Sequence, residues 1–170
     1  KRIDYFRYLD SDPTRESDWV NFVGYRAKGG ANYNIDDQHN IFANVGYFEK
    51  APFMNAVFLN NENIVNEDAE NQKVVSAELG YGFRSQAFSA TVNAYWTNWK
   101  DRTLTRSFPN PDGTRGFANI LGINALHQGI ELDFKYRATD ALEFTGMASV
   151  GDWVWQDDVT GVEIINEEGE

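Results

Sequence analysis

The sequence predicts an all-β protein, an antiparallel meander of about six long strands that pair as three hairpins. Apolar and polar residues alternate with period two in six separate runs, whereas no stretch repeats apolar residues at helical spacing. Aromatic residues make up 15% of the 170 residues, and glycine occurs 14 times. Because aromatic side chains are enriched in strands, the composition and the alternation predict the same fold class.

The three predicted hairpins span about residues 20–49, 72–99 and 129–155. Their turns are expected in short polar segments near Asp37, Ser85 and Thr139. The third hairpin alternates most strictly. Its apolar set is Ile130, Leu132, Phe134 and Tyr136, and its charged set is Glu131, Asp133, Lys135 and Arg137. All four prolines lie outside the runs, as expected because proline cannot donate a hydrogen bond within a sheet.

The connections between the hairpins are predicted as long polar loops at 50–71, 100–128 and 156–170. Consecutive antiparallel strands run in opposite directions, so every short turn is expected at one end of the sheet and every long loop at the other. This asymmetry is typical of outer-membrane β-barrels. No helix longer than two turns is expected within the strand regions.

Composition excludes several classes of function. The chain has 26 acidic and 15 basic residues, a net charge of -11, so no basic field is available to bind nucleic acid. The absence of cysteine excludes disulfides, cysteine-based zinc sites and thiol nucleophiles. The sequence contains no motif that combines a nucleophile with a base, and none that groups metal ligands. Neither an enzyme nor a cofactor or metal is therefore predicted. No apolar run reaches the roughly 20 residues of a membrane-spanning helix, and residues 1–4 show no export signal.

Alternation alone is also typical of a soluble, half-buried sheet, but three observations favour a transmembrane barrel. The apolar face is continuous over all six strands, and the opposite face is charged or rich in glycine. Short turns and long loops lie at opposite ends. Aromatic residues also frame the aliphatic band, as belts at the two membrane interfaces do. The row expected at the long-loop end is Trp19, Trp96, Trp99, Trp153 and Trp155, and the row at the short-turn end is Tyr33, Phe83, Phe88, Tyr136 and Phe144. The alternative is that the tryptophans cap the core of a β-sandwich.

Four segments resemble barrel strands of TonB-dependent outer-membrane receptors, in particular those of Bacteroidota-like bacteria. They are GGANYNI at 29–35, HNIFANVGYFEKAP at 39–52, ELGYGF at 78–83 and NAYWTNWKDR at 93–102. The resemblance implies a 22-stranded barrel that is closed by an N-terminal plug and imports a ferric siderophore, cobalamin or a glycan with energy from TonB. This sequence shows no plug, no TonB box and no terminal aromatic residue, so we expect a middle fragment of the barrel, about a quarter of it.

Charged residues on the polar face are predicted to face the lumen or the plug: Arg26, Lys28, Glu78, Glu131, Asp133, Lys135 and Arg137. The alternative, an acid–base pair of Glu131 and Asp133, is disfavoured because Lys135 and Arg137 continue the same row as a charge ladder. His39 and His127 are expected to be solvated.

Ligand-binding residues are predicted in the extracellular loops. The connection 100–128 carries Arg102, Arg106 and Arg115, whose guanidinium forks suit a carboxylate- or phosphate-bearing ligand. The alternative is that they pair with neighbouring acidic loops. Trp153 and Trp155 can stack on a sugar or an aromatic ligand, the alternative being a role in the interface belt. An acidic group is interpreted as a solvated loop because it lacks the spacing of a calcium-binding loop: Asp157, Asp158, Glu163, Glu167 and Glu168.

The predicted location is the outer membrane of a Gram-negative bacterium. The expected partners are the lipid bilayer, an extracellular nutrient and, through the plug, the TonB complex, with a surface lipoprotein as a further candidate. Two alternatives stay open at this point. One is another outer-membrane barrel, such as a passive porin or fatty-acid channel, and the other is a soluble β-rich carbohydrate-binding or adhesin module.

Overall fold

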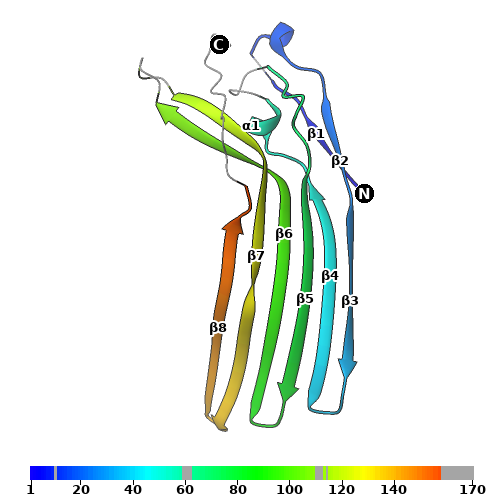
Figure 1. Cartoon of the computed structure of the whole chain (residues 1–170), viewed down its shortest axis with the longest axis vertical. Helices are drawn as coiled ribbons and strands as arrows, with labels where there is room; N and C mark the ends of the chain where they lie inside the picture. The colour runs from blue at the N-terminus through cyan, green and yellow to red at the C-terminus, as the bar shows by residue number, and fades with distance from the viewer. Residues whose placement is uncertain (10, 59–62, 110–112, 114, 158–170) are drawn as a thin grey trace.

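A six-stranded antiparallel sheet forms most of the molecule in the computed structural model, and each strand pairs with the next along the chain (Figure 1). The strands are β3 (Arg26–Asn34), β4 (His39–Lys50), β5 (Gln72–Arg84), β6 (Phe88–Pro109), β7 (Arg115–Thr139) and β8 (Leu142–Trp155). The structure describes residues 1–9, 11–58, 63–109, 113 and 115–157, except for the side chains of residues 13, 105 and 115–119. The predicted meander of about six strands is therefore confirmed.

The three short turns all lie at the lower end of the sheet in Figure 1, as predicted. In the β3–β4 turn, the Asp36 carboxylate accepts hydrogen bonds from the backbone N–H groups of Gln38 and His39, both at 2.8 Å. The hydrogen bond from Gln38 is the main reason why the pKa of Asp36 lies below its ordinary value. The β5–β6 turn closes with a 2.7 Å bond from the Ser85 N–H to the Phe88 carbonyl.

The predicted loop at 100–128 is wrong for most of its length. Strand β6 continues to Pro109 and β7 begins at Arg115, and the two pair antiparallel from the Leu104–Ile120 match to the Pro109–Arg115 match. The polar composition of this stretch resembles that of a loop. Paired strands nevertheless satisfy their backbone groups whatever their side chains, and the alternating threonines of β6 favour extended structure.

A bend separates the lower and upper parts of the β6–β7 hairpin, which leans over at the top of Figure 1. The register shifts twice, between Trp99 and Arg102 and between Arg102 and Leu104. The backbone is left-handed at Asp101 (φ 56°) and at Gly122 (φ 70°), the conformation expected at bulges that kink a strand. The Lys73 ammonium holds the Asp101 carboxylate at 2.7 Å, and this hydrogen bond raises the pKa of Lys73.

The first half of the predicted hairpin 20–49 consists of two strands that are interrupted at Tyr25. Strand β2 (Val20–Gly24) pairs with β1 (Arg2–Phe6) in a separate two-stranded sheet, and β3 then joins the main sheet. The interruption coincides with a local contact: the Tyr25 N–H donates to Glu49 Oε2 at 3.1 Å, and the Glu49 N–H donates to the Tyr25 carbonyl at 2.8 Å.

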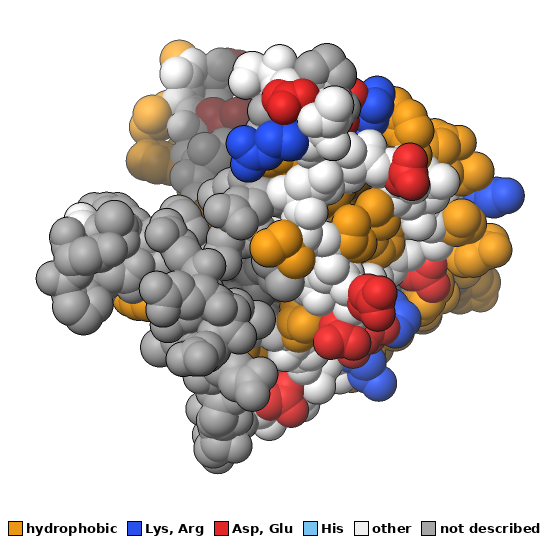
Figure 2. Space-filling model, turned by 90° about the horizontal axis from the view of Figure 1, so that it is seen from above, with side chains coloured by type: hydrophobic (Ala, Val, Ile, Leu, Met, Phe, Trp, Pro, Cys, Tyr) orange, Lys and Arg blue, Asp and Glu red, His pale blue; other side chains and the backbone are white. Residues whose placement is uncertain are grey.

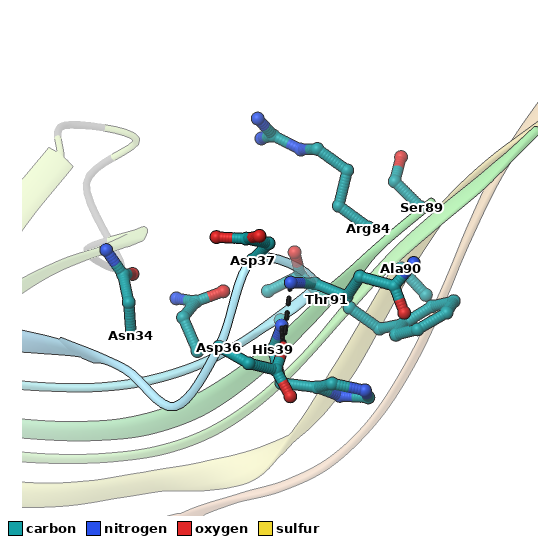
Figure 3. Close-up of a pocket in the computed structure, with 12 residues that line it drawn as sticks. Asn34, Asp36, Asp37, His39, Arg84, Ser89, Ala90 and Thr91 are labelled. Atoms are coloured by element: carbon teal, nitrogen blue, oxygen red, sulfur yellow. Dashed lines mark hydrogen bonds between the residues drawn. The ribbon is translucent and has the colours of Figure 1, made fainter. Parts of the chain in front are cut away.

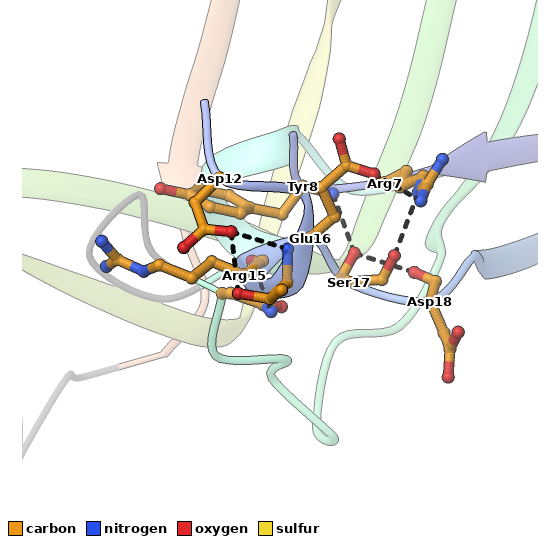
Figure 4. A network of polar contacts seen from close by, with 9 residues as sticks. Arg7, Tyr8, Asp12, Arg15, Glu16, Ser17 and Asp18 are labelled. Atoms are coloured by element: carbon orange, nitrogen blue, oxygen red, sulfur yellow. Dashed lines mark hydrogen bonds and ion pairs between the residues drawn. The ribbon is translucent and has the colours of Figure 1, made fainter. Parts of the chain in front are cut away.

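The connection between β1 and β2 contains a short 3-10 helix, η1 (Pro13–Arg15), and is fixed by polar contacts (Figure 4). The buried Ser17 hydroxyl accepts a hydrogen bond from the Tyr8 N–H at 2.9 Å and donates to the Asp18 carbonyl at 2.8 Å. The Arg7 guanidinium lies 2.6 Å from the Glu16 carboxylate and stacks over the Trp19 ring. These contacts tie Arg7 and Tyr8, which follow β1, to residues 16–19, which precede β2.

The buried apolar side chains gather at the upper end of the sheet. The short helix α1 (Met54–Val57) lies within the predicted loop 50–71. The buried apolar residues of the described chain are Ala56, Val57, Phe58, Val74, Ile123 and Ala125, and Phe58 also contacts the Tyr8 ring. None of the described helices is long and apolar enough to cross a bilayer.

The register assigns every strand residue to one of two faces, because directly paired residues point to the same side of a sheet. One row of the apolar face consists of Tyr33, Ile41, Tyr81, Val92, Leu132 and Ala148. Along β5 this face is apolar from Val75 to Phe83, nine positions, and becomes charged at Lys73. About 9–11 tilted residues cross the hydrocarbon of a membrane, so the band has membrane height.

An aromatic row lies along the lower edge of the apolar face. Phe83 lies 5.0 Å from the His39 ring and 6.2 Å from the Phe88 ring, and Phe88 lies 6.5 Å from Tyr136. Leu79 and Val150, in the middle of the band, are 63% and 74% exposed. In the part of the chain that the structure describes, nothing packs over this face.

Candidate functional site

The face opposite the apolar band carries all of the residues predicted to face the lumen or the plug. The register places Arg26, Lys28, Glu78, Glu131, Asp133, Lys135 and Arg137 there. For example, Glu131 pairs with Asn93, and Asn93 pairs with Gly80. We call this the polar face. That it lines a lumen stays a prediction.

The charges of the polar face are only partly paired. Lys135 lies 2.8 Å from the Glu143 carboxylate, Arg137 lies 4.0 Å from it, and the Asn44 amide donates to Glu78 at 3.1 Å. Exposed pairs of this kind contribute little to stability. Within the described chain, Glu131 and Asp133 form no ion pair with a side chain, and their register partners are Asn93 and Thr91. The register keeps these side chains in one row on the polar face, and the charge ladder stays a prediction.

Two of the hollows on the polar face lie beside β3 and β4. The lower one, of about 670 Å³, is next to the β3–β4 turn and is lined by residues such as Asp36, Arg84 and Thr91 (Figure 3). The middle one, of about 590 Å³, is lined by Lys28, Glu78 and the glycines of β3 and β4. Among the described residues, no hydrogen bond joins the Ser89 or Thr91 hydroxyl of the lower hollow to a base.

A cluster of aromatic rings around one arginine lies on the polar face near the bend of the β6–β7 hairpin. We call it the upper cluster; its members are Tyr95, Trp99, Arg102, His127, Trp153 and Trp155. The Arg102 guanidinium carbon lies 5.0 Å from the Trp99 ring centroid and 5.2 Å from that of Trp155. Both tryptophans pair with Ala125, whose small side chain lies between them and is 1% exposed.

The lower half of the upper cluster fixes Trp153. The His127 ring lies 6.3 Å from Trp99 and 6.1 Å from Trp153, and the Trp153 indole N–H donates to the Tyr95 hydroxyl at 2.9 Å. Tyr95 lies across two glycines: a Cβ at Gly129 or Gly151 would come within 2.7 Å or 2.6 Å of its hydroxyl. The ring of Trp153 is thus held in place while 67% of the residue remains exposed.

The three predicted ligand-binding arginines lie at different heights of one hairpin. Arg102 lies at the bend, opposite Ile123, and Arg106 is exposed opposite Ala118. Arg115 begins β7 opposite Pro109, and its side chain lies outside the described residues. No described carboxylate forms an ion pair with Arg102 or Arg106, so the predicted alternative of pairing with acidic loops is not observed among the described residues.

The register places Trp153 and Trp155 on the polar face, which disfavours the belt alternative. They pair with His127 and Ala125, on the same face as Glu131, whereas Trp96 pairs with Ala77 on the apolar face. Because side chains alternate between faces, Trp99 also points away from Trp96 to the polar face. A one-sided row of tryptophans at the long-loop end is therefore wrong.

Both histidines are half-buried and lie against aromatic side chains, contacts that the expectation of solvated histidines did not include. His127 lies between Trp99 and Trp153, and His39 is hydrogen-bonded to the Tyr81 hydroxyl. In the acidic group, Asp157 accepts a 2.6 Å hydrogen bond from the Asn124 N–H. Asp158, Glu163, Glu167 and Glu168 lie outside the described residues. Among the described residues, no three histidine or acidic side chains are grouped so that they could hold a metal ion.

Sequence reasoning missed Tyr95, Trp99 and His127 as members of the site. The available signal was their spacing along the strands, because residues an even number of positions apart point to the same face. Tyr95 and Trp99 therefore share the polar face with Asn93 on β6, and His127 shares it with Glu131 on β7. The upper end as a whole carries acidic and basic side chains among hydrophobic ones (Figure 2).

Comparison with known proteins agrees with this geometry. The family model described as TonB dependent receptor-like, beta-barrel matches residues 2–169. No curated protein and no solved structure gives a significant match. A two-faced antiparallel wall of membrane height and a family match over nearly the whole chain lead to one conclusion: the chain belongs to the β-barrel family of TonB-dependent receptors.

Proposed function

We propose that this chain forms part of the barrel wall of a receptor that imports a scarce nutrient by TonB-dependent transport, such as a ferric siderophore, cobalamin or a glycan. The family consists of outer-membrane receptors and transporters of Gram-negative bacteria, not enzymes. The observation that carries the proposal is the division of one sheet into an apolar face of membrane height and a charged, glycine-rich face.

The physical basis is the requirement that a membrane imposes on a backbone. Strands can cross hydrocarbon only if all their N–H and C=O groups are paired, and β4 to β7 have neighbours on both sides. Leu79 and Ile130 then meet lipid chains, while Glu78 and Glu131 face water or the plug. A soluble module would have to cover the apolar face with further protein.

The nutrient is proposed to bind at the long-loop end of the polar face. The proposed contacts are Arg102, Arg106, Arg115, Trp153 and Trp155. The seven charged residues of the polar face, Arg26, Lys28, Glu78, Glu131, Asp133, Lys135 and Arg137, are proposed to contact the lumen water or the plug. TonB acts through the plug, and a surface lipoprotein is a further proposed partner. Two observations support this placement: the Arg102 guanidinium forms no ion pair with a described carboxylate, and the ring of Trp153 is exposed.

The test is uptake by cells in which the intact receptor is the only route for a labelled nutrient. Uptake of a labelled ferric siderophore, cobalamin or oligosaccharide is measured with and without TonB. We expect uptake of one of these nutrients, with loss of accumulation when TonB is removed. Equal uptake without TonB would instead identify a passive channel.

A further inference from the structure

We propose that the upper cluster binds a ligand in which a carboxylate is attached to a ring with a flat, apolar face. This inference rests on the proposed function and narrows its substrate class. The two halves of the cluster supply the two requirements: Arg102 provides an anion site, and Trp153 provides a flat stacking surface.

Arg102 lies against two indole rings and forms no ion pair with a described carboxylate. The guanidinium carbon lies 5.0 Å and 5.2 Å from the two indole centroids, so the faces of these rings stabilise the cation. The donor fork of arginine accommodates the two oxygens of a carboxylate. In a chain of net charge -11, an arginine without a described acidic partner beside tryptophans is well suited to select an anion.

Trp153 provides the second contact because its orientation is fixed before a ligand arrives. The indole N–H is engaged by Tyr95 at 2.9 Å, and the ring packs against His127 at 6.1 Å. A held ring loses little conformational freedom on binding, so more of the stacking energy remains as affinity. The hydrogen bond to Tyr95 also removes the polar N–H from the contact surface, which leaves the ring to stack on an apolar face.

Two kinds of molecule share this chemistry, aromatic carboxylates and acidic sugars. The experiment therefore has two arms, measured by equilibrium dialysis on the intact receptor in detergent. One arm uses 2-naphthoate and its neutral counterpart 2-naphthamide, and the other uses trigalacturonate and its methyl ester. We expect one of the two charged probes to bind saturably, and its neutral counterpart to bind at least tenfold more weakly.

Variants assign the binding to the cluster. Replacing Arg102 by glutamine should weaken binding of the charged probe roughly ten- to hundredfold, the range for a hydrogen bond to a charged group, and Trp153→Ala should also weaken it. Arg84→Gln is the matched control, an arginine on the same face at the opposite end of the sheet, and should leave binding unchanged. Heat-modifiable gel mobility checks that each variant is folded.

The proposal is overturned if neither charged probe binds saturably, if the neutral counterparts bind equally well, or if Arg102→Gln binds like the unchanged receptor. Each of these results leaves TonB-dependent uptake to be judged by its own assay. A receptor that imports its nutrient with TonB but fails here would keep the proposed function and lose only this substrate class.

Discussion

Leu132 is the position at which the assignment of the apolar face to lipid is tested most sharply. On β7 it lies four residues from Tyr136, in the lower aromatic row, and four residues from Gln128, where the face turns polar. Four residues rise about 13 Å along a strand, or roughly 10 Å along the membrane normal when the strand tilts by about 40°. Leu132 therefore lies near the middle of the band.

An arginine near the midplane of a transmembrane barrel costs about 2–4 kcal/mol. Leu132→Arg should reduce the folding equilibrium constant roughly thirty- to several-hundredfold, measured by denaturant unfolding of the receptor in phospholipid vesicles. Asp133→Asn is the matched control, because the neighbouring side chain lies on the polar face opposite Thr91. It should leave assembly nearly unchanged.

Destabilisation alone does not separate lipid from a protein core, so the deciding measurement is chemical labelling. The chain contains no cysteine, which makes single cysteines at positions 132 and 133 unique within it. In native membranes, a lipid-phase probe should label Leu132→Cys, and a water-soluble maleimide should label only Asp133→Cys. Free labelling of position 132 by the water-soluble reagent would refute the barrel assignment.

Three further predictions test the open sheet, the bend and the turn. The isolated chain in detergent-free buffer should oligomerise, because β3 and β8 are open edges next to an exposed apolar face; a monodisperse monomer in sedimentation would favour the soluble module. Gly122→Val should destabilise the receptor by about 1–2 kcal/mol because φ is 70° there, whereas Gly29→Val, with no neighbour within 4 Å, should cost less in the same unfolding assay. The pKa of Asp36 is lowered in the folded state. The ionised carboxylate therefore stabilises the fold at pH values above its ordinary pKa of 3.8, and this stabilisation is lost as the pH falls through the pKa of the folded state. The stability difference between the unchanged receptor and Asp36→Ala should shrink as the pH is lowered from 7 to 3, and a constant difference would contradict this origin.

The fold was predictable where the two faces of a strand differ most. Residues 130–137 alternate between apolar and charged side chains. A single register therefore places all the apolar side chains on one face and all the charged ones on the other, and this register determines the pairing of the hairpin. The upper parts of β6 and β7 were not predictable from alternation. Above the apolar band neither face meets lipid, and the side chains no longer distinguish a strand from a loop.

The upper cluster was only partly predictable because it depends on the register of three strands at once. Arg102 and Trp155 were recognisable as ligand-binding types, but their proximity requires the bulge at Asp101, which shifts the register between Trp99 and Arg102. That bulge is held by Lys73 of another strand, a contact that no local pattern in 100–128 indicates.

The tryptophans provide a test of which face of the sheet meets lipid, because Trp96 and Trp153 both lie near the upper end but on opposite faces. Trp96 pairs with Ala77 at the upper edge of the apolar band, whereas Trp153 pairs with His127 on the polar face. Brominated lipids quench only fluorophores that approach the acyl chains. In vesicles with brominated lipid, Trp96→Phe should lower the quenched fraction of the receptor's fluorescence, and Trp153→Phe should raise it, because an unquenched emitter is removed. If Trp153→Phe lowered the quenched fraction instead, Trp153 would face lipid. The face assigned from the register and the ligand class inferred from the upper cluster would then both be wrong, since a ring that meets acyl chains cannot stack on a ligand beside Arg102.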